Sequence, residues 1–580
     1  MKILLIQPIL RSFKEIKNDL SNKSVRNLSA KRFNMPLGLL SLGTILKDSG
    51  HDVLISDLDR DYYYYSNDDK IEKSFDDFIR RYLTSRLDSF EPTIIGISGN
   101  FNTVATQIKI MCKNIIDYDK KIKIVVGGHY YTSFYHEILR DGLAHYAVLG
   151  EGEQVMLDLV QTLDKGELSK LDLHPNLVTQ NNVNNKNNIS DAYEFMMNDG
   201  KQRIYSNPQL KKIGAVVKDL ESLPKTKYEL IENFEDYLTS GYDMRMILPH
   251  KEQRAVQLMT SRGCPHLCTY CASWNVHGKK IRAVTPESVL SELEYLVKKY
   301  DINTIVFEDD LFTYSRKRTV EMCKKIVERF GSRFTIDFPN AIAVRTLNDE
   351  VVYWLRKAGM KQINLAIESG NQYVQDKVIK KRIPLETVKP VVDILRKHGV
   401  LVRGYFILGF PGETIEMMKD TMEFARGLRL DWAVFNFAVP IAGSELHYTA
   451  LVGNHLVAQD SDDSTYSDRM LKSDHWDPED LKEIQIKANY TVNFLENVNL
   501  IEGNYHKAKM LFQDILTSYP KHLIANYSLW RTQKGLGEEE AGETEGKIKT
   551  ILKNDSENIA ILNKFNLKNT EPFSNILSQI

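Results

Sequence analysis

The chain has 580 residues, of which 42% are hydrophobic, so it is long enough to form several domains with full-sized cores. Its 76 basic and 77 acidic residues leave a net charge of −1, which excludes the strong field that collects nucleic acid or anionic lipid. We therefore expect a small-molecule or peptide substrate, with no nucleic acid and no membrane as partner. The opening MKILLIQPIL is interpreted as a strand rather than a leader, and we expect a cytoplasmic protein.

The first part of the chain alternates short apolar runs with segments of helical periodicity. Runs of this kind indicate a parallel sheet covered by helices on both faces, which is a doubly wound α/β domain. The expected strands are 2–7, 52–56, 93–98, 123–126 and 145–149, and the expected helices are 38–49, 71–89 and 103–116.

Polar residues and glycines gather where these strands end. Ligands of such sheets bind at the carboxyl ends of the strands, and paired glycines let a bulky planar ligand approach the backbone closely. The alternative is a doubly wound domain whose glycines serve only as turns. The candidate ligand contacts are Gln7, Pro8, Ser98, Asn100, Gly127, Gly128, His129, Gly150, Glu151 and Gly152.

Residues 166–250 are interpreted as a connector. The run Asn181–Asn188 is polar and of low complexity, which is typical of a solvated turn. We attach no chemistry to this segment.

Three cysteines form the most specific motif. Cys264, Cys268 and Cys271 are separated by three and by two residues, so one short loop can direct three thiolates to a single point. Three corners of an iron–sulfur cube require this, whereas a tetrahedral zinc site needs a fourth ligand. An iron left without a protein thiolate can accept the amino and carboxylate groups of a small molecule, which favours catalysis. The alternatives are buried core cysteines, or zinc bound with a distant histidine.

The remaining cysteines, Cys112 and Cys323, lie in helix-like segments and are interpreted as core residues. Five cysteines are an odd number in a large charged chain, so a disulfide scaffold is disfavoured.

From Arg254 the alternation resumes with longer helices, and six strand–helix units predict a partial barrel of parallel strands with its site at their carboxyl ends. The expected strands are 257–260, 304–307, 334–337, 362–366, 402–408 and 432–437. Polar residues follow or end several of these strands, and the candidate contacts among them are Glu308, Arg345, Glu368, Ser369 and Tyr405.

The last part of the chain, residues 451–580, is expected to be helical. The small and large residues from Gly503 to Pro520 have the spacing by which two helices of a tetratricopeptide repeat pack. One repeat cannot bury its own face, so this region is expected to cap the barrel or contact a protein partner. A generic helix hairpin explains the spacing equally well.

The motif Cys264-x3-Cys268-x-Tyr270-Cys271 resembles the signature of the radical S-adenosylmethionine (SAM) enzymes. The order ILLIQP, IGIS, VVGGHY and VLGEGE resembles the cobalamin-binding domain that precedes many of them. The Asp-x-His-x-x-Gly motif of methionine-synthase-type domains is replaced by Gln7-Pro8, and His129 on another loop is not assumed to bind cobalt.

The resemblance implies a [4Fe–4S] cluster on the three cysteines, SAM and cobalamin as cofactors, and an electron donor such as flavodoxin or ferredoxin. It places SAM near Tyr270 and the barrel candidates named above, and cobalamin at the ends of the first sheet. No side chain is an obvious general base. The expected domains are 1–165 (cobalamin-binding-like), 166–250 (connector), 251–450 (radical SAM barrel) and 451–580 (helical).

The activity that the resemblance implies is reductive cleavage of SAM to a 5'-deoxyadenosyl radical, followed by methylation of an unactivated carbon. A rearrangement or cyclisation without methylation remains an alternative, because nothing in the residues separates the two. A redox sensor or scaffold that recruits a partner through the helical tail is the non-enzymatic alternative.

Overall fold

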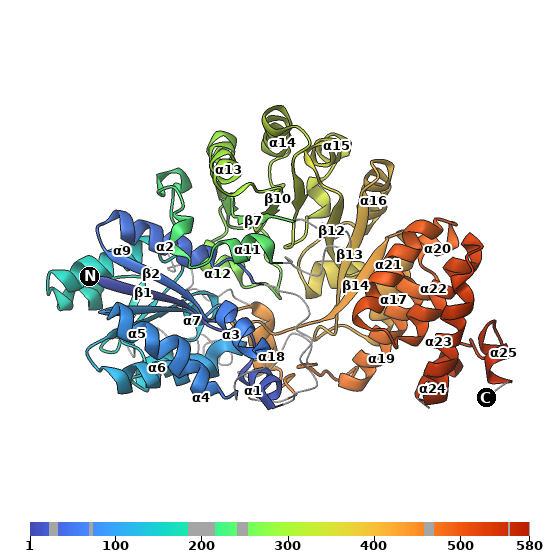
Figure 1. Ribbon diagram of the computed structural model, residues 1–580, viewed down its shortest axis with the longest axis horizontal. Coiled ribbons are helices and arrows are strands. Elements are labelled where there is room, and N and C mark those ends of the chain that lie inside the picture. The colour runs from blue at the N-terminus through green and yellow to red at the C-terminus, as the bar shows by residue number, and fades with distance from the viewer. Residues whose placement is uncertain are drawn as a thin grey trace.

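The computed structural model describes residues 1–21, 33–68, 73–183, 215–240, 253–457, 469–554 and 557–578. Parts of the expected connector, and most of its asparagine-rich run, lie outside these residues. An N-terminal sheet domain, a central barrel and a C-terminal group of helices follow one another across the molecule (Figure 1). Among the described helices, none has both the length and the apolar character needed to cross a membrane.

The N-terminal domain contains a six-stranded sheet with the order β2-β1-β3-β4-β5-β6. The first five strands are parallel, as predicted. The edge strand β6 (Leu177–Thr179) pairs antiparallel to β5 and was not predicted, since its run is too short to show a period. The parallel strands are β1 (Lys2–Gln7), β2 (Asp52–Asp57), β3 (Ile94–Ser98), β4 (Lys123–Gly127) and β5 (Tyr146–Val148).

Alternate residues of β1 enter two different cores, which is why the strand is apolar throughout. Ile3 and Leu5 pack in the core under α2 (Leu37–Asp48) and α9 (Glu153–Asp164). Leu4 and Ile6 pack in the core under the helices of the opposite face. That face is covered by α3 (Leu58–Asn67), α4 (Phe75–Phe78), the π-helical η1 (Ile79–Thr84), α5 (Ser85–Phe90) and α6 (Ala105–Tyr118).

The barrel has the six predicted parallel strands, arranged as two three-stranded sheets of order β11-β10-β7 and β12-β13-β14. Isolated parallel bridges, Ile336 to Met360 and Ile342 to Leu365, join β11 and its following loop to the second sheet. The strands are β7 (Ala255–Leu258), β10 (Thr304–Phe307), β11 (Thr335–Asp337), β12 (Gln362–Glu368), β13 (Leu401–Leu408) and β14 (Trp432–Phe437).

Four of the five barrel helices, all but α16 (Val388–Lys397), begin where the sequence provides a side-chain cap. The hydroxyl of Thr285 accepts from the backbone N–H of Ser288, and Pro286 occupies the first turn. These caps fix the start of each of the four helices and therefore the loop that precedes it. The helices are α13 (Pro286–Tyr300), α14 (Arg316–Phe330), α15 (Asp349–Ala358), α16 (Val388–Lys397) and α17 (Ile415–Gly427).

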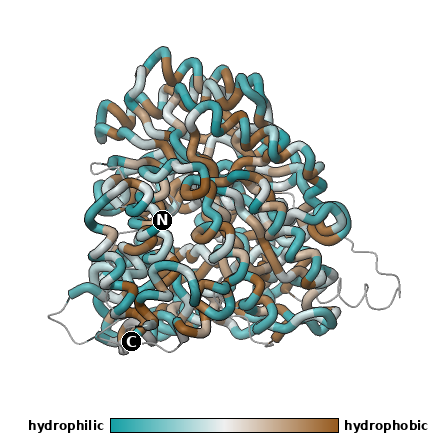
Figure 2. The backbone as a smooth tube through the Cα atoms, turned by 90° about the vertical axis from the view of Figure 1, so that its right-hand side faces the viewer, coloured by the Kyte–Doolittle hydropathy of each residue, from teal (hydrophilic) through white to brown (hydrophobic). Residues whose placement is uncertain are grey.

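Most of the C-terminal helices pack around a core of their own, which Trp432 of β14 also contacts, whereas Leu481 and Ile484 of α19 pack in the barrel core. Hydrophobic tube segments concentrate inside the molecule, and many outer turns are hydrophilic (Figure 2). The helices are α19 (Pro478–Asn489), η10 (Tyr490–Leu495), α20 (Val498–Ile501), α21 (Tyr505–Ser518), α22 (Leu523–Leu536), α23 (Glu540–Asn554), α24 (Glu557–Lys564) and α25 (Phe573–Leu577).

After β14 the chain returns toward the N-terminal domain, where α18 (Glu445–Val452) lies beside it (Figure 1). The His447 ring meets Phe134 edge-on at 5.2 Å between centroids. Asn275 of the barrel donates its side-chain amide to the Gly443 carbonyl at 2.7 Å. This segment therefore ties the barrel to the first domain.

Candidate active site

A cavity of about 1500 Å³ lies between the strand ends of the N-terminal sheet and the opening of the barrel. This volume exceeds the roughly 300–1000 Å³ of ordinary small-molecule sites. It brings together residues that the sequence predicted separately in the two domains. The predicted residues that line it are Gln7, Ser98, Asn100, Gly127, Gly128, His129, Gly150, Glu151, Gly152, Tyr270, Cys271 and Glu308.

Glycines form much of the cavity wall on the side of the first domain. Gly128 has φ +97°, and a Cβ there would lie 2.6 Å from the side-chain oxygen of Asn100. Gly150, with φ +80°, donates its N–H to the hydroxyl of Thr132 at 3.1 Å. Such a wall exposes backbone to a large ligand without intervening side chains, which suits a planar macrocycle.

His129 follows Gly127 and Gly128 in the chain, and its ring faces the barrel. Its ring meets the ring of His277 at 5.5 Å between centroids. Burial lowers the pKa of His129 to about 4, so the imidazole is neutral near neutral pH. A neutral imidazole in this wall can contact a ligand without adding charge to the cavity.

The cysteine loop is framed by a short antiparallel pair, β8 (Ser261–Arg262) and β9 (Arg282–Ala283). Gly263 has φ +94°, and a Cβ there would lie 2.5 Å from the Lys280 carbonyl oxygen, so only glycine fits. The N–H of Cys271 donates to the carbonyl of Cys268 at 3.1 Å, which closes a turn between these two cysteines.

The three thiols sit in a partly desolvated pocket. Burial raises the pKa of Cys264 to about 11 and that of Cys271 to about 12. Within the described ranges, no three His, Cys, Asp or Glu side chains form a group that could hold a metal ion. The thiolates of a cubane bind three different irons, and a donor set of three cysteines from one loop fits such a cluster.

Glu368, a predicted SAM contact, is the last residue of β12. It is buried, and its φ of +71° is rare for a residue with a side chain. Its carboxylate accepts from the Tyr270 hydroxyl at 3.0 Å and from the Lys381 ammonium at 2.6 Å. Backbone strain of this kind persists only where the surroundings impose it, and it often marks functional sites.

Lys381 contributes a buried positive charge beside the cysteine loop. Burial works against its charge, but the Glu368 carboxylate and the Cys268 thiol outweigh it, so that the pKa of Lys381 is raised. The ammonium also lies 3.4 Å from the Tyr270 oxygen. This cation can offset negative charge on ligands of the loop.

Several predicted contacts lie away from the cavity wall. Arg345 is exposed, with a guanidinium nitrogen 3.5 Å from the Arg382 carbonyl oxygen. Ser369 shares a hydrogen bond with Thr421 at 3.1 Å. The predicted residues outside the cavity lining are Pro8, Cys264, Cys268, Arg345, Glu368, Ser369 and Tyr405.

Two carboxylates next to Glu308 hold the loop geometry, a role that the sequence did not predict. Asp309 accepts from the backbone N–H of Thr260 at 3.0 Å. Asp310 accepts from the N–H of Gly263 at 2.9 Å and from the hydroxyl of Ser273 at 2.5 Å. Their only signal in the sequence is the acidic run that follows the second barrel strand.

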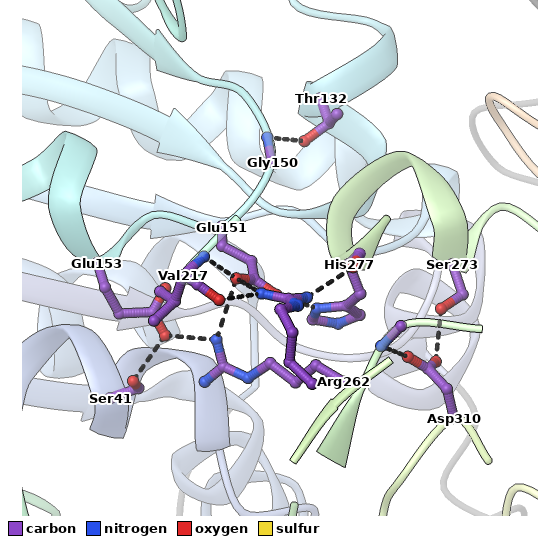
Figure 3. A network of polar contacts seen from close by, with 12 residues as sticks. Ser41, Thr132, Gly150, Glu151, Glu153, Val217, Arg262, Ser273, His277 and Asp310 are labelled. Atoms are coloured by element: carbon purple, nitrogen blue, oxygen red, sulfur yellow. Dashed lines mark hydrogen bonds and ion pairs between the residues drawn. The ribbon is translucent and has the colours of Figure 1, made fainter. Parts of the chain in front are cut away.

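A polar network connects the cysteine loop to the first domain (Figure 3). The Glu151 carboxylate accepts from both terminal nitrogens of Arg282, at 2.7 and 2.8 Å. It also contacts Nδ1 of His277 at 3.0 Å. Glu153 accepts from Arg262 at 2.8 Å, so two carboxylates from the end of β5 meet the residues that flank the loop. Of these residues, sequence reasoning found only Glu151.

Comparison with known families assigns both domains. Residues 24–160 match the B12 binding domain, and residues 258–425 match the Radical SAM superfamily. The chain is 27% identical to cytidylyl-2-hydroxyethylphosphonate methyltransferase of Streptomyces wedmorensis, over 80% of this chain and 86% of that protein. It is 25% identical to the anaerobic magnesium-protoporphyrin IX monomethyl ester cyclase of Rubrivivax gelatinosus, over 72% and 68%.

The fold also resembles a solved structure, the cobalamin-dependent SAM radical enzyme OxsB. The two structures share a TM-score of 0.58 at 15% identity, over 100% of this chain and 83% of that one. This likeness confirms the predicted fold class.

Proposed function

We propose that the chain, in which a match to the B12 binding domain precedes a match to the Radical SAM superfamily, is a cobalamin-dependent radical SAM enzyme. The reaction that we propose is methylation of an unactivated carbon in a small-molecule or peptide substrate. The observation that carries the proposal is the shared cavity, because Gly127 and Gly150 of one domain and Cys271 of the other border the same space.

The three cysteines would hold a [4Fe–4S] cluster, and the glycine wall would hold cobalamin. When bound, the cluster supplies the electron that cleaves SAM, and cobalamin supplies a methyl group to a carbon radical. Reduction requires an external electron donor, for which a flavodoxin or ferredoxin is suited.

The side chains contribute binding and orientation. Glu308 borders the cavity and accepts from the side-chain amide of Gln257 at 2.9 Å, so its carboxylate is oriented to bind the ammonium of SAM. Glu368 is fixed by Tyr270 and Lys381, which prevents it from rotating away from the loop. We assign SAM contacts to these residues.

The proposal is tested by anaerobic purification of the reconstituted chain, with iron, cobalt and visible absorbance measured per chain. About four irons and one cobalamin are expected. Cys268→Ala should lose the iron, whereas Cys112→Ala, a matched change at a buried core cysteine, should keep it. A wild-type chain that retains neither group would overturn the proposal.

Cyclisation is the second candidate function, and it is favoured by the similarity to the monomethyl ester cyclase. SAM with a deuterated methyl group, incubated with the reduced chain and a metabolite extract, separates the two candidates. Label in a new product supports methylation. 5'-Deoxyadenosine that accompanies an unlabelled new product supports cyclisation.

A further inference from the structure

Glu151 occupies the boundary between the glycine wall and the cysteine loop. Like its neighbours Gly150 and Gly152 it lines the cavity, but its side chain is only 2% exposed. Its backbone N–H donates to the Ala215 carbonyl at 2.8 Å, and its carboxylate accepts from the N–H of Val217 at 2.6 Å. The residue therefore contacts residues 215–217 as well as the barrel.

The barrel residues that Glu151 hydrogen-bonds, His277 and Arg282, follow the cysteine loop in the chain. Arg282 is on β9, and its guanidinium also donates to the His277 carbonyl at 2.6 Å. His277 ends α12 (Ser273–His277), which directly follows the last cysteine. The next residue, Gly278, accepts from the N–H of Cys264 at 3.3 Å. One carboxylate thus binds the segment that leaves the loop, and this segment in turn accepts from the N–H of the first cysteine.

A second carboxylate extends the same contact toward α2. Glu153 accepts from Arg262, two residues before Cys264, and from the hydroxyl of Ser41 at 2.7 Å. Arg262 also lies 3.7 Å from Glu151. Buried charges that are paired on several sides resist displacement, because removal of one partner leaves the others uncompensated.

We infer that Glu151 is a positioning residue that couples the binding of cobalamin to the seating of the cysteine loop. The inference rests on the proposed function. A ligand against Gly150 and Gly152 orders the segment that carries Glu151, and a cluster on the cysteines orders the segments that Glu151 binds. Binding of either group then lowers the free energy needed to order the segment that the other group contacts. Thermodynamic linkage requires the cluster and cobalamin to raise each other's affinity by the same factor.

A purely structural ion pair has a different signature. It would stabilise the fold equally with and without the cluster, so its loss would lower the melting temperature and leave the ratio of cobalamin affinities unchanged. The ratio of dissociation constants in the two cluster states is therefore the informative quantity.

The test titrates aquacobalamin into the full-length chain by absorbance, once with the reconstituted cluster and once after the iron is chelated. The wild type should bind at least about tenfold more tightly with the cluster, which corresponds to about 1.4 kcal/mol of coupling. In Glu151→Gln the two dissociation constants should agree within about twofold, because an amide cannot pair with Arg282 as a carboxylate does.

Two further variants keep the test decisive if Glu151→Gln does not fold. His277→Leu removes the contact with Glu151 and should reduce the ratio, whereas His277→Asn keeps an N–H donor near the position of Nδ1 and should retain most of it. Asp236→Asn is the matched control, since it weakens another partly buried ion pair, between Arg60 of the first domain and the connector, at 2.6 Å and away from the cavity.

The outcomes separate the inference from the proposed function. Tight aquacobalamin binding that is indifferent to the cluster in the wild type, or a ratio preserved in both Glu151→Gln and His277→Leu, would overturn the coupling alone. A wild-type chain that binds no aquacobalamin in either state would overturn the proposed function and the coupling with it.

Discussion

Asp310 joins the two ends of the cysteine loop through a single carboxylate. One oxygen accepts from the N–H of Gly263, just before Cys264, and the other accepts from the hydroxyl of Ser273, just after Cys271. Asp310→Ala leaves the Gly263 N–H without its partner, at a cost of about 1–3 kcal/mol. We therefore expect a chelator to remove iron from this variant about tenfold faster than from the wild type, measured over a timed exposure.

Ser273→Ala is the control for this prediction. It removes one of the two hydrogen bonds and leaves the Gly263 contact in place, so the loss of iron should be clearly smaller than in Asp310→Ala. Equal iron retention in all three proteins would show that the loop is held by other contacts.

Glu413 should make the stability of the protein depend on pH. Burial raises its pKa to about 8 from 4.5, although the N–H groups of Phe410 and Gly409 oppose this shift. Because the folded protein binds this proton more tightly than the unfolded chain, the stabilising contribution is full below the ordinary pKa. It is lost progressively as the pH rises to about 8.

The variant Glu413→Gln isolates this effect, because its carbonyl can still accept from both N–H groups and it has no charge to lose. The urea midpoint of the wild type should fall more steeply from about pH 5 to about pH 8 than that of the variant. Other buried carboxyls, such as Asp57 with a pKa of about 7, titrate in both proteins and cancel in the difference. Parallel curves would refute the assignment.

At the scale of elements, the open edge of the barrel is closed by side chains. Asn493 of η10 accepts from the N–H of Ala433 at 2.7 Å and donates to the carbonyl of the same residue at 2.6 Å. Gln485 of α19 donates to the Phe435 carbonyl at 2.7 Å. These amides satisfy backbone groups of β14 in place of a neighbouring strand, which limits edge-to-edge association.

Removal of the Asn493 amide should lower the stability of the folded protein. Asn493→Leu leaves a buried N–H and a buried C=O of Ala433 unpaired, so we expect a loss of about 2–4 kcal/mol in the free energy of unfolding. Asn563→Leu makes the same chemical change on the exposed surface of α24 and should stay within about 0.5 kcal/mol of the wild type. Chemical denaturation followed by circular dichroism measures both, and equal stability of the two variants would contradict the role of Asn493.

The sequence could predict most strands and helices of both α/β domains, because apolar residues recur at a different spacing in a helix than in a strand. It could not predict α3, whose run of tyrosines lacks the usual helix formers, although Asp57 accepts from the N–H of Asp59 and caps its start. Nor could it predict β6, which has three residues and needs β5 as a template.

Prediction of the candidate site from the sequence is limited in the same way, because many of its contacts join residues far apart in the chain. The spacing of Cys264, Cys268 and Cys271 is local and therefore visible in the sequence. The contacts of Asp310 with Gly263, and of Glu151 with Arg282, join residues far apart in the chain. Pairing of β7 with β10 brings the first two together, and packing of the two domains brings the second two together. The sequence shows each charge but not its partner.

At the scale of the whole molecule, the C-terminal helices are part of the barrel's support. Trp476 donates its indole N–H to the Glu413 carbonyl at 2.9 Å and is 3% exposed. A Cβ on Gly409 would lie 2.8 Å from the Leu481 side chain, so α19 packs directly on this loop. The Trp432 ring of β14 meets Phe494 at 5.3 Å between centroids.

A chain that ends at residue 457 keeps every cysteine and every residue that lines the cavity, but it exposes β14 and the apolar groups that α19 and η10 cover. We expect this fragment to aggregate, because an uncovered edge strand beside hydrophobic surface pairs with other copies. Size-exclusion chromatography should show large species, and co-expression with residues 469–580 should restore a compact complex. A monodisperse fragment with the melting temperature of the full chain would instead mean that the tail is an independent appendage, and its contacts with β14 would then contribute little to the stability of the barrel.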